Sequence, residues 1–172
     1  MIVLHANNEV KTFRPFKYPW AYNAWLQSEQ MHWLHTEVPM NEDIKDWNMK
    51  LTEDERKFLT HIFRFFTQGD IDVSEGYLRE LIPAFSEPEV LMMMSSFAAR
   101  EALHIAAYSH LIETLGMPET VYNEFLAYKA MADKHEYLQN QDGDYLSKIA
   151  VFSAFTEGMQ LFSSFIMLLN FQ

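Results

Sequence analysis

Apolar residues recur with a period near 3.6 along almost the whole chain, and this spacing predicts helices. The predicted helices cover about residues 19–35, 52–81, 86–116, 118–139 and 144–172, with a loop between the first and the second. No segment shows the strict apolar–polar alternation that is typical of a strand. The pattern therefore predicts an all-α helical bundle, with residues 1–172 forming a single domain.

Cap signals mark several predicted helix ends. Thr52 with Glu55, and Ser86 with Glu89, have the spacing of a capping box. Gly116, followed by Pro118, predicts the end of the third helix. The last predicted helix runs to residue 172 without an end signal. We therefore expect the structural domain to continue in another polypeptide, unless the chain is a fragment.

Three of the predicted helices place an acid in the middle of an apolar stripe. In the second helix Asp70 lies in such a stripe, whereas Asp72 and Glu75 fall beside it and are predicted to be solvated. In the fifth helix Glu157 takes the same position. The stripe of the second helix contains Leu59, Phe63, Phe66, Val73 and Tyr77, and that of the fifth contains Ala150, Ala154, Leu161, Phe165 and Leu168.

The third helix adds a histidine to its acid. Glu101, His104 and Tyr108 lie among Met94, Phe97, Leu111 and Leu115, and at 100° per residue the three point within about 60° of one another. A buried carboxylate is costly without a partner. Carboxylates and an imidazole that converge inside a helical bundle suit two iron or manganese ions, because the metals supply the compensating charge.

Structural interpretations of the same residues remain open at this point. Glu101 could pair with Arg100 or a lysine in an ordinary polar network, and Tyr108 and Trp33 could be packed core aromatics. The remaining histidines have no paired spacing with an inward acid and are interpreted as surface or structural residues: His5, His32, His35, His61, His110 and His135.

Composition narrows the class of protein. A net charge of −11 argues against binding to nucleic acid or an anionic membrane surface. The absence of cysteine excludes disulfides, thiolate metal sites and cysteine nucleophiles. The N-terminal residues show no signal-peptide pattern, and the apolar segment 161–172 is too short to span a bilayer. We therefore expect a cytoplasmic protein whose last helix is a buried core helix.

Three sequence segments resemble the radical-generating small subunit of class I ribonucleotide reductase. They are FTQGDIDVSEGYL, SSFAAREALHIAAYSHLIETLG and FTEGMQLFSSF, in the order and at the separations of that family, and the resemblance extends from about Trp33 onwards. It implies a ferritin-like helical bundle and a centre of two iron ions, with dimanganese or a manganese–iron pair as alternatives. By this resemblance Asp70, Glu101 and His104 are ligands of the first metal and Glu157 is a ligand of the second.

The resemblance also implies roles for the nearby aromatic residues. Tyr108 matches the tyrosine that dioxygen chemistry at the metals converts to a stable radical, and Trp33 matches the tryptophan that passes an electron from the surface. Leu161 and Phe165 match the apolar pocket around the radical, with leucine at 161 where relatives often have phenylalanine. In this family the radical serves a large subunit that reduces ribonucleotides to deoxyribonucleotides, and the small subunit commonly forms a homodimer.

The family pattern requires a second glutamate and a second Glu-x-x-His on later helices, and none follows Glu157 in this sequence. The aspartate that links the tryptophan to the histidine and the tail that docks on the large subunit are also missing. We therefore expect a complementary chain to supply these parts. Alternative interpretations are a ferritin-like oxidase without reductase coupling, a metal-storage protein, and a structural partner that has lost the chemistry.

Overall fold

The computed structural model describes residues 12–140 and 143–171, and every regular element in that part of the chain is a helix. The α-helices are α1 (Pro19–Gln30), α2 (Asn41–Met49), α3 (Glu53–Gly76), α4 (Pro88–Thr114), α5 (Thr120–Asn123), α6 (Lys129–Gln139), α7 (Tyr145–Ile149) and α8 (Phe162–Leu169). The 3₁₀ turns are η1 (His35–Glu37), η3 (Ile82–Ala84) and η4 (Phe125–Ala127), and the π-helical segments are η2 (Tyr77–Leu81) and η5 (Ala150–Leu161).

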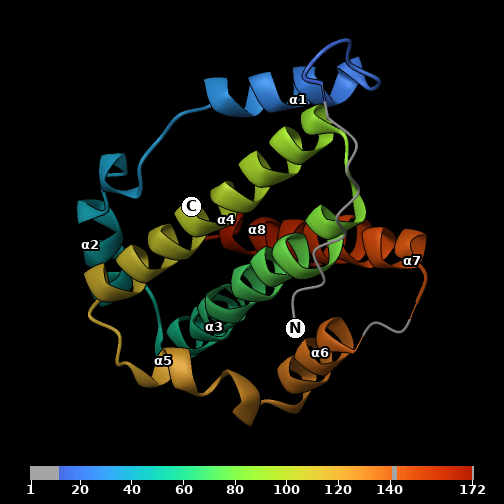
Figure 1. Ribbon diagram of the computed structural model, residues 1–172. Coiled ribbons are helices and arrows are strands. Elements are labelled where there is room, and N and C mark those ends of the chain that lie inside the picture. The colour runs from blue at the N-terminus through green and yellow to red at the C-terminus, as the bar shows by residue number, and fades with distance from the viewer. Residues whose placement is uncertain (1–11, 141–142, 172) are drawn as a thin grey trace.

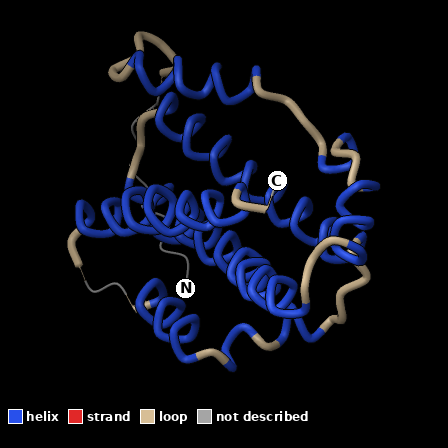
Figure 2. Tube along the Cα trace, turned by 180° about the vertical axis from the view of Figure 1, so that it is seen from behind, coloured by secondary structure: helices blue, strands red, loops and turns tan. Residues whose placement is uncertain are grey.

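The long helices α3 and α4 pack against each other at the centre of the molecule (Figure 1). Helix α1 lies along the N-terminal part of α4, and α6 packs beside α3. Helices α7, η5 and α8 form one continuous helix, which crosses the α3–α4 pair on the far side in Figure 1 and on the near side in Figure 2. The predicted all-helical bundle is therefore observed.

The hydrophobic core lies mainly between α3 and α4. Phe66 is 1% exposed at its centre, and burying a side chain of this size contributes roughly 1.5–3 kcal/mol to stability. A second, smaller cluster of Ala21, Val90 and Met93 joins α1 to α4. The buried members of the main cluster are Leu59, Ile62, Phe63, Phe66, Ile112, Leu115 and Val121.

Helix α1 is held to α4 by hydrogen bonds as well as by packing. The guanidinium of Arg100 donates to the carbonyl oxygens of Ser28 and Met31, at 2.6 Å for Met31. The Ser96 hydroxyl donates to the Glu29 carboxylate at 2.7 Å. Because these bonds occupy carbonyl groups at the end of the helix, α1 ends at Gln30 rather than at residue 35 as predicted.

The two predicted capping boxes have different outcomes. The box at Thr52 is confirmed, since the Thr52 hydroxyl accepts from the Glu55 N–H and the Glu55 carboxylate accepts from the Thr52 N–H at 2.7 Å. The box at Ser86 is wrong, because the N-cap of α4 is Glu87, one residue later. Glu89 instead accepts from the Tyr18 N–H at 2.7 Å, at the start of α1.

The predicted end of the third helix at Gly116 is confirmed. Gly116 has φ +67°, a left-handed conformation that favours glycine. The Gly116 N–H donates to the Glu113 carbonyl and the Met117 N–H to the Ile112 carbonyl, which is the paired pattern of a Schellman motif.

Two predicted segments have different boundaries in the structure. The predicted loop between residues 35 and 51 contains η1 and the short helix α2, which is mostly polar. The predicted helix 118–139 is divided into α5, η4 and α6, with Tyr128 extended between the last two. Arg64 of α3 donates to the Tyr128 hydroxyl at 2.9 Å and to the Glu124 carboxylate, which holds the interrupted segment against α3.

Asp72 is not solvated, contrary to the prediction, and is 3% exposed. Its carboxylate accepts from His135 of α6 at 2.8 Å and from Gln68 at 2.9 Å. Helix α6 therefore covers Asp72, which lies beside the apolar stripe. His135, predicted to be a surface or structural residue, has a structural role. Among the remaining predicted surface or structural histidines, His5 lies outside the described residues.

The stripe predicted for the last helix is partly wrong because η5 is π-helical. Ala150 and Ala154 are exposed, whereas Val151, Phe152 and Thr156 are buried. A π-helix has more residues per turn than an α-helix, so the inward positions shift. By length and composition, Tyr145–Leu169 could also cross a membrane, and only 22% of its most apolar window is buried in the described chain. One face of this helix packs against the main core, but the full burial that the sequence predicts is not observed in the described chain.

We predict that Thr52→Ala lowers the free energy of unfolding by about 1 kcal/mol, because it removes the side-chain cap of α3. Ser86→Ala is the matched control and is expected to change stability by only a few tenths of that amount, since Ser86 does not cap α4. Urea denaturation of both variants measures the difference. Equal losses for the two variants would contradict the assignment of the caps.

Candidate metal centre

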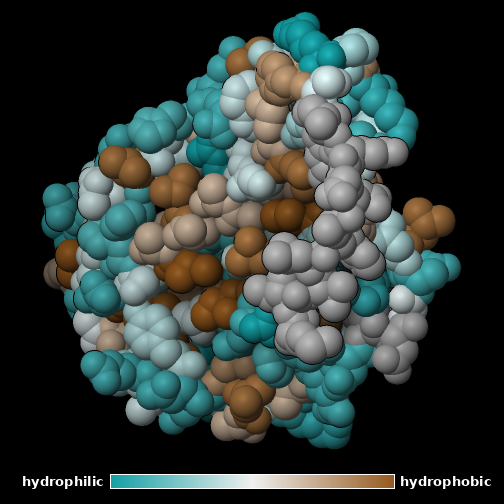
Figure 3. Space-filling view, viewed as in Figure 1, coloured by the Kyte–Doolittle hydropathy of each residue, from teal (hydrophilic) through white to brown (hydrophobic). Residues whose placement is uncertain are grey.

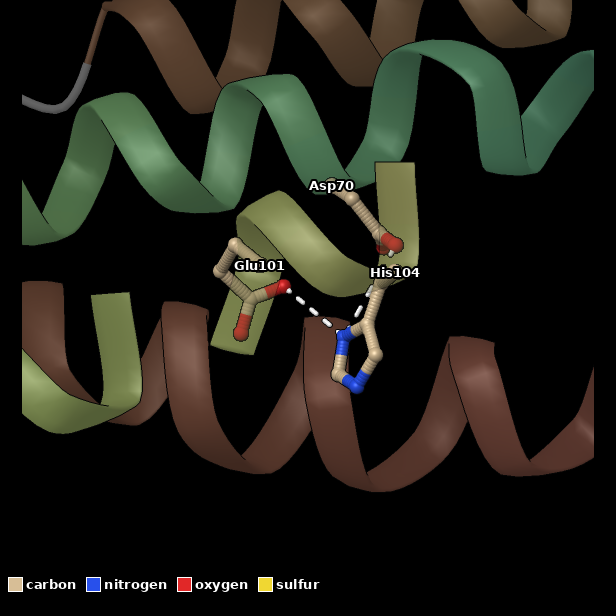
Figure 4. Close-up of side chains that lie close together, drawn as sticks. All are labelled: Asp70, Glu101 and His104. Carbon is tan, nitrogen blue, oxygen red and sulfur yellow. Dashed lines mark hydrogen bonds and ion pairs between the residues drawn. The ribbon is translucent and has the colours of Figure 1, made fainter. Parts of the chain in front are cut away.

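Three of the predicted ligands converge in the structure. Asp70 points from α3 toward Glu101 and His104, which lie one turn apart on α4 (Figure 4). One potential ligand atom from each residue lies within 4.8 Å of the others. His104 Nδ1 is 3.3 Å from the Glu101 Oε2 atom and 3.9 Å from the Asp70 Oδ2 atom. Glu101 and His104, which their spacing places on one face of α4, thus both lie close to Asp70 of α3.

Burial and mutual repulsion make the ionised state of this cluster unfavourable. The pKa of Asp70 is raised to about 7 by burial and then by the charges of Glu101 and Glu157, while His104 opposes the shift. The pKa of Glu157 is also raised to about 7, by burial and by Glu101. The pKa of His104 is raised by its hydrogen bond to Glu101. Ionisation of Asp70 and Glu157 is therefore costly here, and a bound cation would offset this cost.

The donor set fits a metal ion. Asp70 Oδ2 is buried and has no hydrogen-bond partner, which is costly for a carboxylate oxygen unless something binds it. Carboxylate oxygens together with an imidazole nitrogen suit iron and manganese. The alternative in which Glu101 pairs with Arg100 is not observed, because Arg100 binds the end of α1.

Glu157 lies outside the set of three residues whose ligand atoms are within 4.8 Å of one another. It comes from η5, and its charge raises the pKa values of Asp70, Tyr77 and Tyr108. Glu157 therefore belongs to the same electrostatic cluster but is set apart from the first three ligands. Its role as a ligand of a second metal stays a prediction.

Tyr108 lies in an apolar pocket next to the cluster. Its ring stacks on Phe66 with centroids 4.5 Å apart and planes 15° from parallel, and Phe66 also contacts Phe165. Leu161 and Phe165 pack against the same core cluster as Tyr108. Burial and the charges of Asp70, Glu101 and Glu157 raise the pKa of the Tyr108 phenol, so it stays protonated at neutral pH.

Trp33 lies in the segment between α1 and η1, outside the helix that was predicted to contain it. Its ring stacks on the His104 imidazole, with centroids 6.4 Å apart. The structure therefore brings Trp33 directly against a predicted metal ligand, and both line an open cavity of about 370 Å³ beside α1.

Sequence reasoning missed two aromatic residues of this region, although it placed both in the apolar stripe of the second helix. Phe66 is the stacking partner of Tyr108. Tyr77 lines a cavity together with Glu157. Periodicity places a residue on the inward face but does not predict which inward residue meets which neighbour.

Residues 10–172 match the family model described as ribonucleotide reductase, small chain. The chain belongs to this family, and the ferritin-like helical bundle expected from the sequence is confirmed.

Particular relatives agree with the family assignment. The chain is 50% identical to a probable ribonucleoside-diphosphate reductase small subunit of Invertebrate iridescent virus 6, over 92% of this chain and 49% of the relative. It is 51% identical to the corresponding protein of Invertebrate iridescent virus 3, over 93% and 48%. The chain thus spans about half the length of these curated relatives.

A solved structure shares the fold. The dimanganese(II) form of NrdF from Streptococcus sanguinis superimposes with a TM-score of 0.76 at 21% identity, covering 91% of this chain and 56% of that chain. The shared arrangement of helices extends over most of the chain described here.

We predict that Asp70→Asn raises the stability of the metal-free protein at pH 8 by about 1–3 kcal/mol, and by less at pH 5. The folded-state pKa of Asp70 is about 7, above its ordinary value of 3.8, so the folded chain holds a proton that the unfolded chain releases. Stability of the metal-free protein therefore falls as pH rises from about 4 to about 7, and the amide removes this cost.

Denaturant titrations in a chelator at both pH values measure this effect. Asp54→Asn, in the exposed first turn of the same helix, is the control and lacks the increase. A decrease in stability for Asp70→Asn at pH 8 would show that the ionised carboxylate is satisfied without metal.

Proposed function

We propose that this chain forms the first half of a radical-generating small subunit of ribonucleoside-diphosphate reductase. The observation that carries the proposal is the convergence of Asp70, Glu101 and His104 beside the buried phenol of Tyr108, in a chain of the small-chain family. The product of the complete enzyme is the deoxyribonucleotide, and we place the assembly in the cytoplasm because a reducing compartment suits a chain without cysteine.

Asp70, Glu101 and His104 would hold the first metal, and Glu157 would bind the second. We infer two iron ions, with manganese in one or both positions as the alternative, because the oxygen and nitrogen donors suit either element. When bound, the metal pair supplies the electrons that reduce dioxygen and the oxidising power that is passed to a nearby side chain. The unpartnered Asp70 oxygen and the raised pKa values of Asp70 and Glu157 support this assignment.

The side chains of this protein perform the remaining tasks. Tyr108 keeps its phenolic proton at neutral pH, and it is the side chain that the metal pair, once oxidised by dioxygen, would oxidise. Phe66, Leu161 and Phe165 exclude water from the ring, which protects a radical from quenching. Trp33, stacked on His104, offers the contact through which an electron reaches the cluster from the surface.

The missing ligands require helices beyond those of this sequence. The last helix has a face on which apolar residues recur at steps of four and three, and all of them are at least half exposed: Phe155, Met159, Phe162, Ile166 and Leu169. Such a face is typical of a helix that packs against others. We propose that the helices of the second half of the family fold, on a complementary chain, cover this face and supply the second glutamate and the second Glu-x-x-His.

The apolar surface is not confined to that helix. Figure 3 has the view of Figure 1, in which the last helix lies on the far side of the molecule. On the near side it shows hydrophobic residues gathered in a band across the middle, with hydrophilic residues around it. The completed small subunit is proposed to act as a homodimer with a large catalytic subunit, as the family resemblance implies. The net charge of −11 of the present chain gives no support for a nucleic-acid partner.

Native mass spectrometry and electron paramagnetic resonance test the proposed function. We expect protein purified gently from its source to contain a second polypeptide and two metal ions, and to form a tyrosyl radical with iron(II) and dioxygen. Tyr108→Phe abolishes the signal because it removes the oxidisable phenol, while Tyr77→Phe and Tyr22→Phe retain it. Uptake of many metal ions per complex would instead indicate storage, and a radical without reductase coupling would indicate an oxidase.

The proposed joining face has its own test. Ile166 is 68% exposed, and Ile166→Glu is expected to weaken binding of the complementary chain by about tenfold or more, because it places a charge in an apolar interface. Leu126→Glu, at a position 60% exposed on η4, is the matched control. Calorimetric titration of each variant with the complementary chain measures the effect. Unchanged affinity for Ile166→Glu would contradict this assignment of the face.

A further inference from the structure

A small cavity adjoins the candidate metal centre on the side of Glu157. It has a volume of about 160 Å³ and lies between η2, α4 and the α7–η5 helix. Leu81, Phe97 and Phe152 form apolar walls, and the polar side chains that line it are Tyr77, Ser153 and Glu157. Ser153 is exposed whereas Leu81 is buried, so the cavity extends from the surface toward the interior.

The helix geometry keeps this space open. The two π-helical segments, η2 and η5, both contribute to its walls. π-Turns are rare and frequently occur at functional sites. Gly76 precedes η2, and a Cβ atom there would come within 2.5 Å of the Phe152 ring. Glycine at position 76 therefore allows Phe152 to occupy the wall.

The lining determines the class of ligand. A dry apolar cavity of about 150 Å³ can bind xenon or benzene. This cavity is similar in size and has few polar groups, so it suits a small neutral apolar molecule and is too small for a nucleotide. We propose that it is the site through which dioxygen reaches the metal centre, an inference that rests on the proposed function.

The position of the cavity separates dioxygen from the proposed radical. Tyr108 packs with Phe66, Leu161 and Phe165, and none of these four residues lines the cavity. Glu157 lines the cavity and belongs electrostatically to the acid cluster. Dioxygen entering here would meet the metal-ligand side of the cluster without crossing the pocket that shields Tyr108.

Xenon is the probe for the cavity, because it is apolar, dense and independent of any metal. In crystals of the metal-free protein under xenon pressure, we expect a xenon atom beside Phe97 and Phe152. Met94→Trp should remove it, because Met94 also lines the cavity. Absence of xenon from the wild-type cavity would overturn the proposal.

Access is tested separately in the metal-loaded complex. Ser153→Trp places a bulky ring at the exposed rim and should slow dioxygen-dependent oxidation of the metals about tenfold, with metal content unchanged. Ser147→Trp is the control, since Ser147 is also exposed on the same continuous helix but lines neither the cavity nor the proposed joining face.

Equal oxidation rates for the two serine variants would overturn the access role. If Ser153→Trp does not fold, Met94→Trp takes its place, and an unchanged oxidation rate for it would overturn the same role. Failure of the wild-type complex to react with dioxygen would refute the proposed function, whereas the xenon experiment would still report on the cavity.

Discussion

The rest of the structure depends on the electrostatic cost of the acids that lie inside the bundle. Asp70 and Glu101 are almost fully buried and face one imidazole, with Glu157 close enough to raise the pKa of Asp70. Within the described chain no lysine or arginine is hydrogen-bonded to these three acids. A cation offsets the cost directly, and the free Asp70 oxygen has the position of a ligand atom. The single imidazole of His104 faces more than one buried acid, and this imbalance suits a bound cation.

The scaffold holds the cluster through packing and hydrogen bonds that lie outside it. Helices α3 and α4 share the main core, which sets the distance between Asp70 and the Glu101–His104 turn. Arg100, next to Glu101 in sequence, fastens the end of α1 to α4, so the segment that contains Trp33 begins at a defined place. In the same way, His135 of α6 lies within hydrogen-bonding distance of Asp72, two residues from Asp70, and gives this second buried acid a partner outside the cluster.

The described chain encloses the cluster on one side only. Tyr108 is shielded by Phe66 and by residues of the last helix, whereas the outer face of that helix is apolar and exposed. The chain spans about half the length of these curated relatives, and in the proposed function a complementary chain would cover this face. The π-helical form of η5 matters here because it sets which residues of the last helix face inward.

Sequence by itself determined the helical class and the inward position of Asp70, Glu101 and His104, because these depend on local periodicity and on spacing within each helix. The family was expected from the resemblance of three sequence segments. The sequence also predicted the cap at Thr52 and the end at Gly116, which are local backbone features. Tertiary structure alone decided that Asp72 is buried against His135, that Glu89 binds the start of α1, and that Tyr108 stacks on Phe66. It also decided the inward phase of η5, where Ala150 and Ala154 are exposed. These properties depend on contacts between segments distant in the chain, and no periodicity within a single helix encodes them.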